Sequence, residues 1–77
     1  MQEMSDARQA IAAAVQANAE GLAPDSLSEA RRYLMEAEEQ IRNQAYGPAR
    51  VSAVRAKNRA VQALEASQRA AGSQKKE

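Results

Sequence analysis

The chain contains no cysteine, histidine, tryptophan or phenylalanine, and its only aromatic residues are Tyr33 and Tyr46. Without cysteine or histidine it has no disulfides and lacks the usual ligands of zinc, haem and iron–sulfur clusters. It also lacks the aromatic platforms on which single-stranded RNA stacks. These absences argue against an enzyme, and we expect no catalytic residue, no bound cofactor and no metal.

No apolar run approaches the roughly 18 residues of a membrane span. No signal-peptide core follows Met1, so an exported form would have lost its targeting segment. Strand-forming β-branched and aromatic residues are too few for a sheet, whereas alanine occupies 19 of the 77 positions. Composition therefore predicts one small all-helical domain.

Charge is divided unevenly along the chain, although the net charge is only +1. Residues 1–40 hold eight acidic and three basic side chains, whereas residues 41–77 hold two acidic and eight basic ones. Such asymmetry can mark interfaces with two different molecules. We favour the simpler interpretation, in which an acidic helix lies against a basic one.

Three helices are expected in a single domain over residues 1–71, and they span residues 5–20, 25–44 and 48–70. Gly47–Pro48 separates the second helix from the third. Residues 72–77 contain no apolar side chain, so we expect a disordered tail there.

Local signals predict where the first two helices begin and end. Ser5 is a candidate N-cap, and Gly21 is suited to the left-handed position that follows a helix. Pro24 is tolerated in a first helical turn, and Ser26 with Glu29 has the spacing of a capping box.

The third helix places small residues at alternating steps of four and three, which puts them on one face. These residues are Ala49, Ala53, Ala56, Ala60, Ala63, Ser67 and Ala70. Methyl side chains allow neighbouring helices to approach closely. We therefore predict an all-α antiparallel three-helix bundle, or extended helical hairpin, with an alanine-rich seam.

Leu27, Leu34 and Ile41 recur every seven residues in the second helix. They are expected to pack against Ala53, Ala56 and Ala60, which would make the second and third helices the best-packed pair.

The first helix has only three large apolar residues, Met4, Ile11 and Val15. It is expected to pack loosely, or against a second copy in a homodimer. The opposing argument is that small alanine patches are only weakly hydrophobic and can remain in water.

Arg55, Arg59, Gln62 and Arg69 share one side of the third helix. This basic ridge could contact phosphates of a nucleic acid. Pairing with the glutamate-rich second helix, or solvation, is the interpretation we favour.

The densest carboxylate cluster is Glu36, Glu38 and Glu39. A metal-binding bundle would pair such glutamates with histidine, so a solvated acidic face is the better interpretation. Tyr33 and Tyr46 could anchor a binding surface, but filling gaps beside small alanines is the more common role.

Four segments occur together in one order: Ala-Arg-Gln-Ala-Ile-Ala-Ala-Ala (7–14), Ala-Pro-Asp-Ser-Leu-Ser-Glu-Ala-Arg (23–31), Leu-Met-Glu-Ala-Glu (34–38) and Ala-Tyr-Gly-Pro-Ala-Arg (45–50). This order resembles the alanine-rich helical family known as domain of unknown function 4398, over roughly residues 5–67. Leu22 and Gly47–Pro48 depart from the family's usual residues at the two corners.

The resemblance implies a bacterial envelope protein, periplasmic or at the outer membrane, and commonly a lipoprotein after signal removal. It brings no catalytic residue. The expected function is a non-enzymatic structural or protein-interaction module whose partner is another protein or a second copy. Membrane attachment would come only through a lipid anchor outside this chain. The alternative is a small nucleic-acid-binding regulator that uses the basic ridge.

Overall fold

The computed structural model describes residues 1–75, and all regular secondary structure in that range is α-helical. The helices are α1 (Gln2–Gln16), α2 (Ala19–Leu22), α3 (Pro24–Arg42) and α4 (Tyr46–Lys75). The all-α fold predicted from composition is therefore confirmed.

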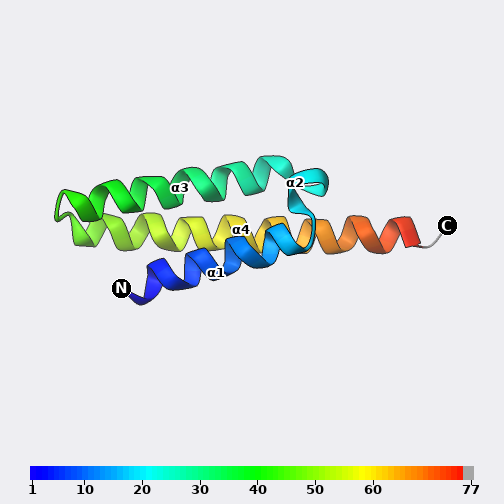
Figure 1. The fold of residues 1–77 in the computed structure, drawn as a ribbon, viewed down its shortest axis with the longest axis horizontal. Helices are drawn as coiled ribbons and strands as arrows, with labels where there is room; N and C mark the ends of the chain where they lie inside the picture. The colour runs from blue at the N-terminus through cyan, green and yellow to red at the C-terminus, as the bar shows by residue number, and fades with distance from the viewer. Residues whose placement is uncertain (76–77) are drawn as a thin grey trace.

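Helix α4 is the axis of the molecule, and α1 and α3 both lie along it (Figure 1). Its 30 residues span about 45 Å at a rise of roughly 1.5 Å per residue. That length accounts for most of the molecule's 51 Å extent. Helix α3 is antiparallel to α4, whereas α1 runs in the same direction as α4 (Figure 1). Since α1 and α3 touch each other far less than either touches α4, the fold is a hairpin with α1 added along its second helix.

The alanine-rich seam of α4 is buried, as its spacing predicts. Solvent reaches none of Ala49, Ala53, Ala56, Ala60, Ala63 and Ser67, and Ala70 is half-buried. A serine fits into this apolar seam because its hydroxyl donates a 2.8 Å hydrogen bond to the carbonyl oxygen of Ala63, one turn earlier. Small side chains along the seam let both α1 and α3 approach the backbone of α4.

The core includes two clusters of packed side chains at different heights along α4. One contains Ala14, Ala19, Ala23, Leu27 and Ala63, and the other contains Met4, Ala37 and Ala53 with Leu34 and Ile41 packed against it. The prediction that α3 and α4 form the most extensive helix pair is confirmed.

One predicted contact within that pair is wrong. Leu34 and Ile41 pack in the cluster of Ala53, but Leu27 shares a cluster with Ala63 and not with the seam residues nearer the turn. In an antiparallel hairpin, residues equally distant from the turn face each other. Leu27 is far from the turn at residues 43–45, and it therefore meets α4 correspondingly far along.

Helix α1 packs more closely than its few large residues suggest. Met4 is buried, and Ile11 packs against the cluster of Ala14 and Leu27. Helix α3 covers only part of the alanine seam of α4, and α1 packs along the rest. Of the three residues expected to face a second copy, Val15 alone is exposed.

The predicted start of the first helix is wrong by three residues, whereas that of the second is within one residue of the observed start. Helix α1 begins at Gln2 with Met1 as its N-cap residue, so Ser5 lies inside the helix. Helix α3 begins at Pro24, and no side-chain cap is formed at its N-cap residue, Ala23. The fixed φ of proline starts the helix there, which leaves Ser26 too late to act as a cap.

The first break in the chain is made by Asn18 and not by Gly21. Asn18 has a φ of 65°, whereas Gly21 is part of α2 with ordinary helical backbone. Asparagine tolerates the left-handed region better than most residues, so α1 can end at Gln16. The expected single helix over 5–20 is therefore two helices.

The second break is made by Gln44, which has a φ of 62°. Its N–H donates to the carbonyl oxygen of Ile41 at 2.9 Å, and the N–H of Ala45 donates to that of Gln40 at 2.8 Å. This pair of bonds is a Schellman motif, which usually has glycine at the left-handed position. Pro48 is inside the first turn of α4, where its missing N–H leaves no helical bond unmade, so Gly47–Pro48 does not separate the helices.

Helix α4 continues to Lys75, beyond the expected end at residue 70. One glycine lowers helix stability by only about 1 kcal/mol, and Gly72 therefore does not end a helix formed by alanine, arginine and glutamine neighbours. The helix thus extends into the segment expected to be a disordered tail, whose residues 76 and 77 lie outside the described range. The division into a domain over 1–71 and a tail stays a prediction.

Candidate interaction surface

The basic ridge predicted on α4 is divided by the fold. Arg55, Gln62 and Arg69 are exposed, but Arg59 is half-buried beside α3. Its Nε lies 3.0 Å from Oε1 of Glu29, an ion pair without the alignment of a hydrogen bond. The ridge therefore does not present a continuous row of bases to solvent.

Tyr33 joins α3 to α4 together with Arg59. The guanidinium carbon of Arg32 is 5.1 Å from the centroid of the Tyr33 ring, and that of Arg59 is 6.0 Å away. Both distances are within the range of cation–π attraction. Tyr33 is half-buried, in keeping with a packing role, whereas Tyr46 is exposed at the start of α4.

Two of the three carboxylates in the predicted acidic cluster of α3 are paired with arginines, and the third, Glu36, is exposed. Glu38 forms a 3.3 Å ion pair with Arg8 of α1, and Glu39 forms a 2.6 Å ion pair with Arg42 in its own helix. The hydrogen bond and charge of Arg42 hold the pKa of Glu39 below its usual value. In the part of the chain that the structure describes, no group of three acidic, histidine or cysteine side chains is placed to hold a metal.

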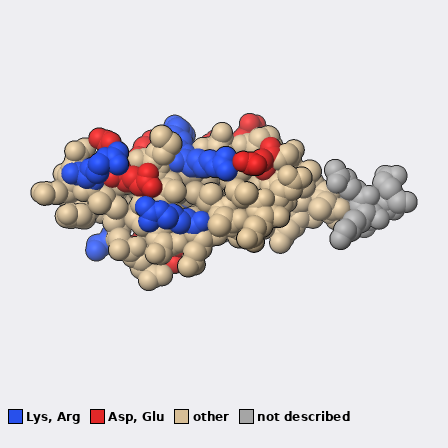
Figure 2. Space-filling model, viewed as in Figure 1, with Lys and Arg blue, Asp and Glu red and all other residues tan. Residues whose placement is uncertain are grey.

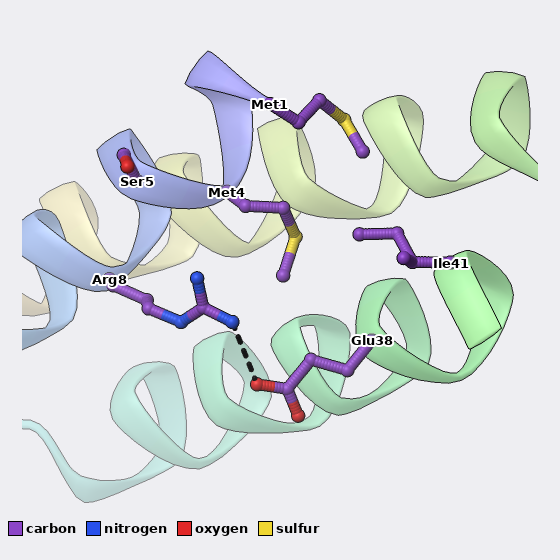
Figure 3. A pocket seen from close by; sticks show the side chains of 6 residues that line it. All are labelled: Met1, Met4, Ser5, Arg8, Glu38 and Ile41. Atoms are coloured by element: carbon purple, nitrogen blue, oxygen red, sulfur yellow. Dashed lines mark hydrogen bonds and ion pairs between the residues drawn. The ribbon is translucent and has the colours of Figure 1, made fainter.

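A shallow pocket of about 290 Å³ lies between the start of α1 and the end of α3 (Figure 3). Its lining residues are Met1, Met4, Ser5, Arg8, Glu38 and Ile41. The Arg8–Glu38 pair crosses one side, and Met4 and Ile41 belong to the core cluster of Ala53. The pocket is thus the open edge of the core, closed on one side by a structural ion pair.

The exposed side of α4 carries a feature that the sequence analysis did not select. Arg50, Val51, Val54 and Arg55 line a shallow surface groove of about 330 Å³, which we call the valine–arginine face. Val51 is 51% exposed and Val54 is 44% exposed. With about 3.6 residues per turn, both valines fall opposite the buried seam. The sequence did contain a signal for this face, because the three-residue spacing of Val51 and Val54 places both valines on the side of the helix away from the alanines.

Ion pairs only partly neutralise the charge asymmetry of the chain. Among the side chains described, those of residues 1–72, Glu29–Arg59 is the ion pair that joins α3 to α4, while the other pairs join α1 to α3, α2 to α3, or lie within α3. Acidic and basic side chains alternate on the face shown in Figure 2. Arg50, Arg55 and Lys57 form no ion pair within the described part, so α4 keeps unneutralised positive charge.

The sequence matches the family described as Domain of unknown function (DUF4398) over residues 2–77. The chain belongs to this family. This confirms the resemblance seen in the sequence and extends it from residue 2 to the last residue, 77. No curated protein and no solved structure matches the chain. Among the described residues of this DUF4398 domain, no helix is both long enough and apolar enough to cross a membrane.

Proposed function

We propose that this DUF4398 domain is a non-enzymatic structural or protein-interaction module of a bacterial cell-envelope lipoprotein. The observation that carries the interaction part is the valine–arginine face. Two valines remain about half exposed on the longest helix, between arginines that form no ion pair in the described part of the chain. Apolar patches rimmed by polar residues mark interaction sites when they are large; this strip is small, and the arginines on both sides of it add charges with which a partner's carboxylates can pair.

A non-enzymatic role is supported by how the fold uses its charged side chains. Glu20, Glu29, Glu38 and Glu39 each lie within 3.3 Å of an arginine. Three of these pairs join helices to each other, and the fourth, Glu39–Arg42, lies within α3, so these carboxylates serve the packing of the fold. The partner is another protein or a second copy of the chain.

The envelope part of the proposal rests on the family resemblance, and it is tested in the cell. The complete gene product that contains this chain is produced in its own bacterium with an alkyne-bearing palmitate and partitioned with Triton X-114. We expect label and recovery in the detergent phase. The isolated 77-residue chain is the matched control, since it has no cysteine to carry the lipid. Unlabelled gene product in the cytosolic fraction contradicts the envelope assignment.

The interaction part is tested by photo-crosslinking in the same cells. Val54 is replaced with p-benzoylphenylalanine, and Ala12, which is exposed on α1, is replaced in the control. A discrete covalent complex from position 54 and none from position 12 is expected. Absence of any complex from position 54 contradicts the proposal.

Binding to duplex DNA would instead favour a nucleic-acid-binding regulator. Neutralisation of several phosphates gives a steep fall of affinity with salt. Because Arg59 is engaged by Glu29, we expect no such binding at low salt. A steep salt dependence that Arg55→Gln and Arg69→Gln reduce would overturn the proposed function.

A further inference from the structure

The valine–arginine face contains an apolar centre with a base on each side. Val51 and Val54 are one turn apart on the outward side of α4, and the groove that they line is bordered by Arg50 and Arg55. Residues three apart on a helix are neighbours, so the two valines form one continuous apolar strip. A ridge of side chains from another helix can lie along such a strip.

The charge around the strip selects the partner. The exposed side of α4 carries Arg50, Arg55, Lys57 and Arg69, whereas Glu65 is the acidic residue of this helix within the described range. Arg50 and Arg55 form no ion pair with other described residues. Two guanidinium groups beside an apolar strip suit carboxylates, with which arginine forms paired hydrogen bonds.

A second copy is a poor occupant for this face. Pairing the face with itself would bring Arg50 and Arg55 of one copy near Arg50 and Arg55 of the other, and like charges at an interface weaken association. A lipid surface is also a poor occupant, since interfacial helices insert tryptophan, phenylalanine or leucine and this strip offers two short valines.

We infer that the valine–arginine face binds an acidic amphipathic helix of another envelope protein. Apolar side chains of that helix lie on Val51 and Val54, and its flanking carboxylates meet Arg50 and Arg55. The inference rests on the proposed function and names the partner class for the same surface. The strip is small, so binding is expected in the micromolar to millimolar range that small transient interfaces occupy.

The experiment measures fluorescence anisotropy of a labelled synthetic peptide titrated with the purified 77-residue chain. The probe is a helix of about three heptads with leucine at a and d and glutamate at e and g. One control peptide has lysine in place of glutamate, and the other has serine in place of leucine. We expect saturable binding of the acidic leucine peptide alone, weakened by added salt.

Matched variants locate the site on the protein. Val51→Ser together with Val54→Ser, and separately Arg55→Glu, should each weaken peptide binding by about tenfold or more. Met35→Ser, at a residue 67% exposed on α3, is the apolar control. Arg69→Glu makes the same charge change farther along α4 and is the electrostatic control. Helicity by circular dichroism is expected to be unchanged in all of them, because each position is exposed.

Each outcome bears on the inference. Selective binding that is lost in the face variants and kept in the controls supports it. No saturable binding up to about 1 mM, or binding that the face variants leave intact, overturns it. Binding of phosphatidylglycerol vesicles, or chain dimerisation in sedimentation equilibrium that the face variants abolish, would assign the face to another occupant and also overturn it. These results are separable from the lipid-labelling test, which can succeed while the peptide test fails.

Discussion

Replacement of Ala56 with leucine tests whether close helix approach on the seam is what stabilises this fold. Ala56 has no exposed surface and lies between Ala53 and Ala60, which are also fully buried. Leucine adds three carbon atoms where α1 and α3 both approach α4, so the helices must move apart. Overpacking of this kind lowers the free energy of unfolding by about 1–3 kcal/mol.

The size of the protein makes this loss easy to measure. At about 0.05–0.15 kcal/mol per residue, the 77 residues amount to roughly 4–12 kcal/mol of stability. Each kcal/mol lost lowers the Tm of a domain this small by about 4–8 °C. Thermal and urea unfolding are followed by far-ultraviolet circular dichroism, and we expect a lower Tm and a lower urea midpoint.

The control is Ala12→Leu, the same chemical change at an exposed position of α1. It should leave stability within about 0.5 kcal/mol of the original protein. Ala56→Gly and Ala12→Gly form a second pair. Both lose helix propensity, but only the first removes a buried methyl group, worth about 0.8 kcal/mol more. If Ala56→Leu were as stable as Ala12→Leu, the seam would not be a close contact and the argument from small side chains would be wrong.

Three further outcomes are expected. Gln44→Gly should stabilise the fold by about 0.5–1 kcal/mol, because glycine adopts the left-handed backbone without the strain of a Cβ; a lower urea midpoint would contradict this. Ser52→Ala removes the 2.8 Å hydrogen bond from the buried Ser52 hydroxyl to Gln40 Oε1 and should cost about 1 kcal/mol in urea unfolding, whereas no loss would mean that this bond contributes nothing. Arg42 lowers the folded-state pKa of Glu39, so the original protein should be more stable than Glu39→Gln at neutral pH. This difference should shrink once pH falls below the ordinary glutamate pKa of about 4.3 and vanish below the lowered folded-state pKa; a difference that persists in strong acid would contradict it.

Much of the core could be predicted from the sequence because burial follows local periodicity. The alternation of four and three residues from Ala49 to Ser67 places those side chains on one face of any straight helix. Alanine-rich composition fixed the secondary structure class in the same way. Both inferences concern one helix at a time, so they do not require knowledge of which helices pack against it.

Helix ends were less predictable, because the alternative residues at which a helix can end differ by little in backbone conformational energy. Asn18 and Gln44 take the left-handed positions although Gly21 and Gly47 are close by. The left-handed backbone costs a non-glycine residue only about 1–2 kcal/mol. Docking of three helices on one seam can outweigh that cost, so tertiary packing and not local preference selected the turn residues.

The sequence by itself determined an all-helical chain, an alanine seam on its last helix and a surplus of basic charge in its second half. Only the tertiary structure decided which charges remain available. In the sequence, Arg59 is one of four residues in a basic ridge. In the structure, packing of α3 against α4 places Glu29 and Tyr33 beside it. The valine–arginine face is exposed because α1 and α3 both pack against the alanine seam on the other side of α4. Burial of a small-residue seam permits the closest packing, and the bulkier valines on the opposite side were left facing solvent.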